Sequence, residues 1–363
     1  MKTILFVRFK NTKVGGAENY LTLLRNTLRQ KTQVFSSGDY GQDSQFKLTP
    51  PKFLPSFLRF IIFLRAYESL YQKNPNYLYF SLERVLHCDI YRAGDGIHRQ
   101  WLSIKNHNFI QKIKSYFNPM NILYIYIEKR LFKNTKLIIA NSKMIKTSLI
   151  TMFNIPQEKI KVIYNGIQIP KTINKTLAKQ NLFMDFPFLT NKIIILFVGS
   201  GYARKGLKQA LLMLSEIPHK NWHFIVIGKD KKIPLYAKLA KTLNIDKNVL
   251  FLGPKENIKR FYESSDIFLF PTIYEPCSNA TLEAASYQNA IITTKQNGAG
   301  ELFLQDHILE HPNAITQGSK ILQNLLENPT FLKTTQQKCA DSVVHLTIEN
   351  NLQNTLKAME DFL

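Results

Sequence analysis

Short apolar runs alternate with helical patterns throughout the second half of the chain. The runs are continuous rather than alternating, which is typical of parallel strands buried on both faces. They occupy residues 193–199, 223–228, 249–252, 267–270 and 290–294. Helical periodicity fills the segments between them, from about residue 205 and over residues 235–243, 257–263 and 279–287. This regular alternation predicts a doubly wound parallel sheet.

The first half of the chain starts with the same kind of unit. An apolar run at residues 4–7 precedes Gly15-Gly16, after which helical periodicity begins. Further apolar runs at residues 77–80 and 137–140 are interpreted as parallel strands. A polar stretch that ends near residue 191 separates the two halves, so we expect two successive α/β units of similar size.

The predicted fold is α/β, with two Rossmann-like doubly wound domains that face each other across a cleft. Such sheets bind ligands at the carboxyl ends of their strands. We expect an N-terminal domain at residues 1–168, a C-terminal domain at 169–345, and a C-terminal helix at 346–363 that packs back toward the N-terminal domain. The length of 363 residues fits two domains, because single hydrophobic cores stop growing at about 250–300 residues.

Charge narrows the class of partner. The chain has 48 Lys and Arg against 26 Asp and Glu, a formal net charge of +22. Such an excess favours polyanionic partners, which include nucleic acid, anionic lipid and phosphorylated substrates. Charge alone does not choose among them.

Cysteine and apolar content set the expected compartment. Cys88, Cys277 and Cys339 are odd in number and lack metal-like spacing, so they predict neither a disulfide framework nor a zinc site. A reducing cytoplasm fits this pattern. No uninterrupted apolar run approaches the roughly 18–20 residues needed to span a bilayer, so we do not expect the chain to cross a membrane.

Two strand-to-helix turns contain groups that suit an anion. At Gly15-Gly16 the missing side chains let backbone amides approach a ligand, although the pair also fits an ordinary tight turn. After the strand at 193–199, Arg204 and Lys205 could together neutralise a diphosphate, since Arg offers a planar fork and Lys a compact charge. The alternative is a solvated pair on the surface of a very basic protein.

Two carboxylates flank a predicted helix start after the strand at 267–270. Glu275 lies on the loop, Ser278 is placed to cap a helix that begins near Asn279, and Glu283 falls just beyond the first turn. Carboxylates in these places could accept hydrogen bonds from sugar hydroxyls while the helix N-terminus faces phosphate. A capping pattern on a solvated face is the alternative.

A third candidate lies in the first domain. Asp95 is flanked by Gly94 and Gly96, so its carboxylate is expected in an open turn that a ligand could reach. An Asp-Gly pair is also an ordinary turn. His98 follows Asp95 closely and could contact a ligand or lie on the surface. The sequence leaves open whether Asp95 or His98 makes the contact. His87 and His98 lack a third ligand at metal spacing, so no metal site is predicted.

Two basic, aromatic stretches in the first domain could lie on an anionic membrane surface. They run over residues 52–65 and 109–133. Aromatic and aliphatic side chains would enter the interface while each Lys or Arg near the lipid phosphates contributes about 1 kcal/mol. Core helices with solvated basic edges are the alternative.

The order and placement of these motifs resemble family 4 of the retaining glycosyltransferases, which have the GT-B fold. The resemblance spans nearly the whole chain and rests on Gly15-Gly16, Asn165-Gly166-Ile167, Glu275 with Glu283, and the segment from Gly298 to Glu301. The adjacent Arg204-Lys205 and the stretch from Asp89 to Asp95 are most similar to the lipopolysaccharide core glucosyltransferases. Pro276-Cys277 departs from the common family pattern, which leaves the donor sugar open.

The resemblance implies a role for each motif. The second domain would bind a nucleotide-sugar donor, with UDP-sugar as co-substrate, and the first a lipid-linked oligosaccharide acceptor. Arg204 and Lys205 would stabilise the leaving diphosphate, Glu275 would bind the hexose, and Asp95 would lie near the acceptor and the anomeric centre. The implied donor-binding residues are Gly15, Gly16, Gly199, Ser278, Asn279, Ala280 and Glu283, of which Glu283 would bind the ribose.

The implied reaction is retaining transfer of a hexose, glucose favoured, onto a lipopolysaccharide or lipooligosaccharide core. No cofactor and no metal are expected, because fixed cations and amides would supply the charge stabilisation. The expected location is cytoplasmic, peripherally associated with the inner membrane. Another cell-surface glycan is an alternative acceptor.

The residues alone leave two other classes of protein as alternatives. A basic nucleic-acid-binding protein would explain the charge, but the sequence contains no recognisable nucleic-acid-reading module and nucleic acid is not an expected partner. A Rossmann oxidoreductase is disfavoured because the G-x-G-x-x-G signature is absent.

Overall fold

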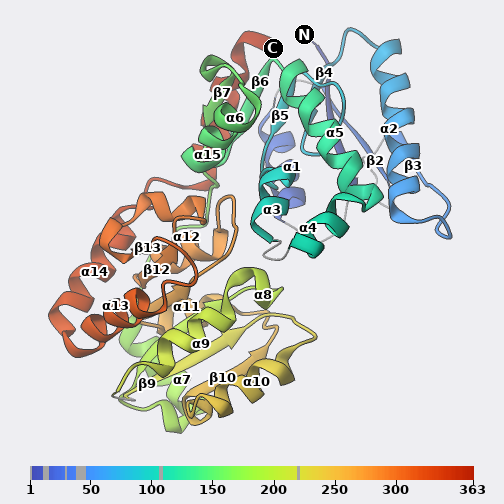
Figure 1. Cartoon of the computed structure of the whole chain (residues 1–363). Coiled ribbons are helices and arrows are strands. Elements are labelled where there is room, and N and C mark those ends of the chain that lie inside the picture. Colours follow the sequence, from blue (N-terminus) through green and yellow to red (C-terminus); the bar gives the residue numbers. More distant parts are fainter. Residues whose placement is uncertain (1, 11–15, 29–30, 38–45, 106–108, 219–220) are drawn as a thin grey trace. The chain divides into compact units, whose positions relative to one another are not determined.

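The chain forms two compact units in a computed structural model, which describes residues 2–10, 16–28, 31–37, 46–105, 109–218 and 221–363 (Figure 1). The first unit comprises Met1–Tyr164 together with Glu349–Leu363, and the second comprises Asn165–Ile348. The first unit therefore ends at residue 164, where the sequence places the boundary at 168. The residues from Glu349 onward belong to the first unit.

The first unit is built on a seven-stranded sheet whose pairings are all parallel. The strand order is β3-β2-β1-β4-β5-β6-β7. The strands are β1 (Ile4–Lys10), β2 (Thr32–Ser37), β3 (Phe46–Leu48), β4 (Leu78–Ser81), β5 (Ile90–Arg92), β6 (Leu137–Ala140) and β7 (Ile160–Val162).

Helices enclose this sheet. They are α1 (Gly16–Thr27), α2 (Ser56–Lys73), α3 (His98–Lys105), α4 (Phe109–Tyr116), α5 (Pro119–Asn134), α6 (Lys143–Phe153) and α15 (Ile348–Met359), with short 3₁₀ turns η1 (Gln157–Lys159) and η6 (Glu360–Phe362). All residues of β4, β5 and β6 are buried, so both faces of the sheet are covered. Aromatic rings fill one layer: Phe60 of α2 packs on Phe9 of β1 at 4.9 Å and on Tyr124 of α5 at 5.3 Å between centroids.

The second unit has a six-stranded, fully parallel sheet in the order β10-β9-β8-β11-β12-β13. Its strands are β8 (Ile193–Val198), β9 (Trp222–Ile227), β10 (Val249–Gly253), β11 (Ile267–Phe270), β12 (Ala290–Thr294) and β13 (Ile308–Leu309). Its helices are α7 (Lys175–Asp185), α8 (Tyr202–Lys205), α9 (Leu207–Ser215), α10 (Ile233–Thr242), α11 (Lys259–Ser264), α12 (Asn279–Ser286), α13 (Ile315–Glu327) and α14 (Pro329–Asp341), with 3₁₀ turns η2 (Pro187–Leu189), η3 (Asp246–Asn248), η4 (Gly298–Leu302) and η5 (Gln305–His307).

The prediction of two doubly wound parallel sheets is confirmed, and the chain order of strands reverses beside β1 and beside β8. The helix expected from about residue 205 is α9, and a short helix that the sequence did not predict, α8, precedes it, separated from α9 by Gly206 at φ 81°. Within the described residues, none of the helices is both long and apolar enough to cross a membrane.

Candidate functional site

In the second unit the turn after β8 is shaped by glycine. Gly201 and Gly206 have φ angles of 73° and 81°, in the left-handed region that favours glycine. A Cβ added to Gly206 would lie 1.9 Å from the carbonyl oxygen of Pro271, the residue after β11. Only glycine therefore lets the short helix α8 approach the chain that leaves β11. This close approach places Arg204 and Lys205 beside the loop that contains Glu275.

The side chains of Arg204, Lys205 and Glu275 converge, as the sequence predicts for neighbouring strand ends. The Arg204 guanidinium donates to Glu275 Oε2 at 2.6 Å and to the Tyr274 carbonyl at 2.9 Å, and Lys205 Nζ contacts the same carboxylate oxygen. The backbone carbonyl of Arg204 accepts from Ile273 N at 2.9 Å. Two cations thus share one carboxylate, which leaves the group with a net positive charge.

Burial differs within this group. The Lys205 side chain is 12% exposed and Glu275 15%, whereas Arg204 is 37% exposed. Burial lowers the pKa of the Lys205 ammonium, and the negative charge of Glu275 opposes that shift. The Lys205 ammonium also lies 5.2 Å from the centre of the Phe270 ring. Lys205 is therefore a fixed, partly desolvated cation that a further anion would stabilise.

The N-terminus of α12 opens beside this group. Ser278 caps the helix as predicted, accepting a hydrogen bond from Thr281 N at 3.2 Å. Asn279 is exposed and Ala280 half-buried, whereas Thr281 and Leu282 are fully buried. Only Asn279 and Ala280 of the first turn are therefore accessible, at a helix N-terminus that favours negative charge.

Glu283 lies one turn further along α12. Burial raises the pKa of its carboxyl, while the Tyr262 hydroxyl and the charge of Lys259 lower it. Tyr262 is 1% exposed and Glu283 is half-buried. A partly exposed carboxylate in this place can accept a hydrogen bond from a ligand hydroxyl.

In the first unit Asp95 lies in the turn between β5 and α3, and half of its side chain is exposed. Arg8 Nη1 contacts its carboxylate at 3.2 Å and lies 4.0 Å from Glu83. Burial raises the pKa of the Glu83 carboxyl, against the opposing charge of Arg8. The Arg8 guanidinium therefore lies next to two carboxylates at the carboxyl end of the sheet.

The backbone around Asp95 is held by buried side chains. Arg84 Nη2 donates to the Gly96 carbonyl at 2.9 Å, and Asn141 Nδ2 donates to the Gly94 carbonyl at 3.2 Å. The Arg84 guanidinium is paired at 2.8 Å with Glu128, a fully buried carboxylate of α5. Because these contacts leave the Asp95 side chain half exposed, the turn presents a carboxylate on a rigid base.

His98 is engaged within the protein. Its backbone N–H donates to Glu128 Oε1 at 2.6 Å, and its Nε2 lies 3.0 Å from Asn121 Oδ1. Burial lowers the pKa of the imidazole, with Arg84 adding to the shift. The structure therefore places Asp95, rather than His98, as the more accessible of the two groups.

Gly16 is the first residue of α1, and Gly15 lies outside the described residues. Gly199 directly follows β8, where its N–H donates to the Ile227 carbonyl at 2.9 Å. Sequence reasoning missed Arg8, Tyr262 and Asn297, whose partners are distant in sequence. Asn297 carried one usable signal, the Asn-Gly pair typical of a turn.

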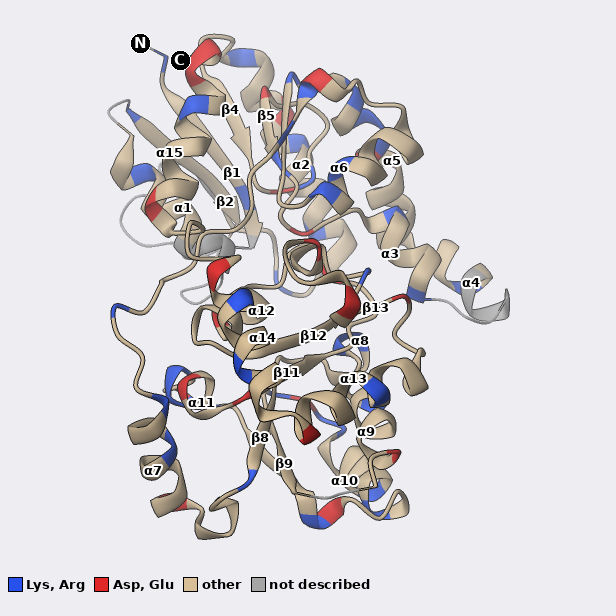
Figure 2. Cartoon of the chain, turned by 90° about the vertical axis from the view of Figure 1, so that its left-hand side faces the viewer, with Lys and Arg blue, Asp and Glu red and all other residues tan. Residues whose placement is uncertain are grey.

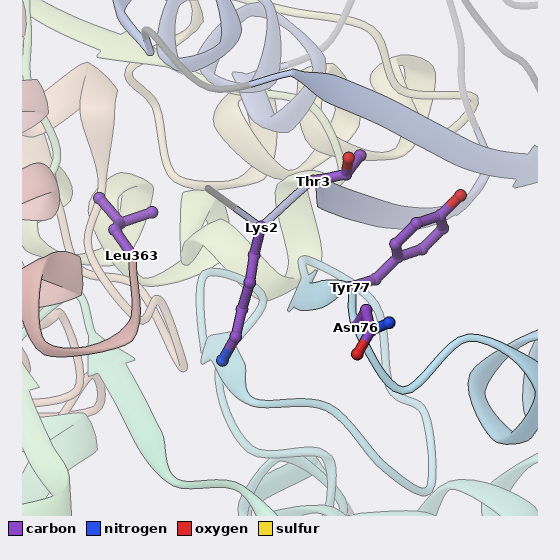
Figure 3. A pocket seen from close by; sticks show the side chains of 5 residues that line it. All are labelled: Lys2, Thr3, Asn76, Tyr77 and Leu363. Carbon is purple, nitrogen blue, oxygen red and sulfur yellow. The ribbon is translucent and has the colours of Figure 1, made fainter.

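Two further features bear on ligands. An open hollow of about 400 Å³ lies at the opposite, amino-terminal end of β1 and β4, lined by Lys2, Thr3, Asn76, Tyr77 and Leu363 (Figure 3). It is separate from the strand ends that carry Asp95. Among the residues that the structure describes, no group of three or more His, Cys, Asp or Glu side chains is arranged to hold a metal ion.

Two family models match the chain, one for each half. The model described as Glycosyltransferase Family 4 matches residues 14–169, and the model described as Glycosyl transferases group 1 matches residues 179–343. Together they include Asp95, Arg204, Lys205, Glu275 and Glu283.

Curated relatives include two bacterial transferases. The N-acetylgalactosamine-N,N'-diacetylbacillosaminyl-diphospho-undecaprenol 4-alpha-N-acetylgalactosaminyltransferase of Campylobacter jejuni is 26% identical over 236 residues, 63% of this chain and 60% of the relative. The lipopolysaccharide glucosyltransferase WaaG of Escherichia coli is 24% identical over 220 residues, 57% of this chain and 55% of the relative. The chain spans about half the length of the curated relatives it matches.

Solved structures share the whole fold. A crystal structure of WaaG, a glycosyltransferase involved in lipopolysaccharide biosynthesis, superposes with a TM-score of 0.78 at 18% identity, covering 98% of this chain and 99% of that one. Anabaena HepE in complex with UDP and glucose superposes with a TM-score of 0.74 at 18% identity, covering all of both chains. At these identities the likeness is one of fold.

Proposed function

Because the chain belongs to the family 4 glycosyltransferases, which have the GT-B fold, we propose that it transfers a hexose, glucose favoured, from a UDP-sugar to a lipopolysaccharide or lipooligosaccharide core. The anomeric configuration of the donor is retained. The reaction takes place at the cytoplasmic surface of the inner membrane.

The convergence of Arg204 and Lys205 on Glu275 carries this proposal. A departing nucleoside diphosphate gains negative charge, and the two cations are fixed where that charge develops. The carboxylate between them accepts hydrogen bonds from the hexose hydroxyls. The site therefore binds both halves of the bond that breaks, the sugar and the leaving phosphate.

The remaining donor contacts come from neighbouring elements. The N-terminus of α12 at Asn279 and Ala280 faces a phosphate, with Ser278 as its cap, and the half-buried carboxylate of Glu283 accepts from the ribose hydroxyls. Gly199 leaves room for the donor beside β8. The loop at Gly15-Gly16 contributes backbone amides to the same phosphates.

Asp95 acts on the acceptor side, close to the anomeric carbon. The acceptor hydroxyl attacks that carbon from the face that the diphosphate leaves, and the departing phosphate oxygen takes its proton. No cofactor is needed, and we propose that activity persists in EDTA because Arg204 and Lys205 supply the positive charge that a divalent ion would otherwise provide.

A membrane-bound acceptor is supported by the surface of α4 and α5. Apolar side chains are exposed at Ile113, Tyr116, Phe117, Ile122 and Tyr126. The residues 99–146 contain ten Lys or Arg and a single acid, Glu128, which is buried.

Lys and Arg recur along α5 and α6 (Figure 2), and the first unit carries 15 of the 22 net positive charges. Both stretches bury apolar residues in the core, Phe60, Phe63 and Leu64 in α2 and Ile127, Leu131 and Phe132 in α5, but the stretch at 109–133 exposes five large apolar side chains whereas the stretch at 52–65 exposes Phe53. We therefore assign peripheral binding to the stretch at 109–133.

The relative from Campylobacter favours one second candidate. Its name places its acceptor on a diphospho-undecaprenol carrier. A polyprenyl-diphosphate-linked glycan, another cell-surface acceptor, would suit the same exposed apolar and basic surface.

The proposal is tested by incubating the full chain with a panel of nucleotide sugars and two acceptors, a truncated lipooligosaccharide and a polyprenyl-diphosphate glycan, and reading the mass of the products. We expect hexose addition from a UDP-sugar, loss of transfer in Glu275→Ala and Lys205→Ala, and retention seen in the anomeric coupling by NMR. Neither hydrolysis nor transfer from any UDP-sugar, together with a tight nucleic-acid gel shift, would favour the basic binding-protein alternative.

A further inference from the structure

Asn297 lies between β12 and η4 and is 1% exposed. Its side chain makes four hydrogen bonds. Oδ1 accepts from Ser278 N at 3.3 Å and from Ala299 N at 3.2 Å, and Nδ2 donates to Thr281 Oγ1 at 3.1 Å and to Thr293 Oγ1 at 3.0 Å. The amide oxygen accepts two hydrogen bonds and the amide nitrogen donates two, each with a different residue, so the side chain is fully bonded.

These bonds join three elements that a donor would contact. Ser278 and Thr281 belong to the capped start of α12, Thr293 lies on β12, and Ala299 lies in η4. The Thr293 hydroxyl itself donates to the Phe270 carbonyl at 2.8 Å, which extends the connection to β11. A single buried amide thus fixes the start of α12 relative to two strands.

The backbone beside Asn297 holds Glu275 from both sides. Glu275 N donates to the Gln296 carbonyl at 2.9 Å, and Gly298 N donates to the Glu275 carbonyl at 2.9 Å. The side chain of Asn297 fixes this segment, and the segment in turn fixes the backbone of Glu275. Glu275 and the N-terminus of α12 are therefore held in one arrangement by the same residue.

We propose that Asn297 is the positioning residue that sets Glu275 and the first turn of α12 at the spacing required by the sugar and the diphosphate of one donor. The inference rests on the proposed function, because it assigns those two groups to the two parts of the donor. Asn297 does not touch the donor in this account. Its effect passes through both groups. UDP-sugar would engage both Glu275 and the start of α12, whereas UDP would engage only the latter, so the loss of Asn297 should weaken UDP-sugar binding more than UDP binding.

Asn289 provides a matched control. It is fully buried in the same domain, and its Nδ2 donates to the carbonyls of Tyr262 at 2.8 Å and Ala284 at 2.9 Å. It follows the end of α12, whereas Asn297 contacts its start. Asn289→Ala therefore removes a buried amide of the same kind without releasing Glu275.

The test compares kcat, the donor KM, the dissociation constants of UDP and of the UDP-sugar, and Tm for the wild type, Asn297→Ala and Asn289→Ala. We expect kcat to fall about 100-fold in Asn297→Ala, the cost of misplacing a reacting group by about 1 Å. We expect the preference for UDP-sugar over UDP to be lost in that variant and kept in Asn289→Ala at a similar Tm.

Thr281→Val removes one of the four bonds with little change in side-chain shape, so it can replace Asn297→Ala in the test if that variant does not fold. Thr281→Val should lower kcat by a smaller factor than Asn297→Ala. Equal weakening of UDP and UDP-sugar, or a kcat loss shared by Asn289→Ala, would overturn the proposal. A wild-type protein without transferase activity would instead contradict the proposed function, so the two failures are distinguishable.

Discussion

The hydroxyl of Tyr262, a fully buried residue, acts on the carboxyl group of the half-buried Glu283. Burial raises the pKa of Glu283, and the Tyr262 hydroxyl is the largest influence that opposes the shift. The ionised form that accepts hydrogen bonds well is therefore maintained by a tyrosine on a neighbouring helix.

Tyr262→Phe should raise the donor KM, because the Tyr262 hydroxyl lowers the pKa of Glu283 and so favours its ionised form. Without this hydroxyl the pKa of Glu283 rises further, so the variant should lose donor affinity at a higher pH than the wild type as the solution is acidified. Donor KM measured between pH 5 and 8 checks both effects. Tyr287→Phe, which alters the ring stacked on Tyr262 at 6.0 Å, is the control and should keep the wild-type profile.

Glu275→Gln should move the alkaline limit of diphosphate binding to lower pH. The negative charge of Glu275 raises the pKa of Lys205, which burial lowers, so removing that charge lowers the pKa of the ammonium further. Lys205 then loses its proton at a lower pH and attracts phosphate less. UDP dissociation constants between pH 7 and 10 report the shift, and an unmoved alkaline limb would show that Lys205 does not bind the diphosphate.

Arg8→Gln should lower kcat about tenfold or more while the donor KM changes little. Arg8 lies 3.2 Å from the Asp95 carboxylate, which is proposed to act on the acceptor, and a displaced group loses its advantage in the transition state. Steady-state kinetics with a fixed acceptor separate the two constants. Lys136→Gln, which breaks the 2.8 Å pair with Asp89 in the same domain, should leave kcat unchanged.

Phe117→Ser combined with Ile122→Ser should weaken binding to anionic vesicles about tenfold or more, because each removes an apolar side chain from the interface. The matched control is Leu177→Ser with Met184→Ser, two exposed apolar residues of the second unit. Co-sedimentation should also weaken as salt rises, since the surface attraction is screened. Equal losses in both pairs, or binding insensitive to salt, would contradict the assignment to α4 and α5.

Gly206→Ala should destabilise the second unit by about 3 kcal/mol or more, because an added Cβ meets the Pro271 carbonyl at 1.9 Å in a left-handed backbone. Gly253→Ala has a similar φ of 66° but open space around the added atom, so about 1–2 kcal/mol is expected there. Denaturant unfolding of both variants isolates the clash. If the two variants lose similar free energy of unfolding, the methyl group added at Gly206 does not clash with Pro271.

Five of the six strands of the second unit were predictable because a parallel strand buried on both faces is a continuous apolar run. Ile193–Val198 and Trp222–Ile227 are six residues each and almost wholly buried. β5 was missed because its three residues, Ile90–Arg92, include a cation, and β13 because it has only two. Strands this short contain too few residues to show a hydrophobic pattern, and they form because neighbouring strands pair with them.

The site could be predicted only in part, for a similar reason. Arg204 and Glu275 were found because each follows a strand end, and parallel strands bring such ends to one edge. The partners that hold them were not found. Tyr262 has ordinary sequence surroundings and Asn297 offers only an Asn-Gly turn signal, and their interactions with Glu283 and Ser278 are set by how helices pack on the sheet.

The first unit is discontinuous in the chain, which has a consequence for its synthesis. Tyr20 of α1 hydrogen-bonds to Thr355 of α15 at 3.0 Å, and Asn351 of the same helix donates to the Tyr164 carbonyl. On the ribosome, residues 2–164 emerge before the whole of the second unit, and α15 emerges after it. The sheet of the first unit therefore lacks one of its helices until the second unit has been synthesised, so the first unit can complete its fold only after the second has emerged.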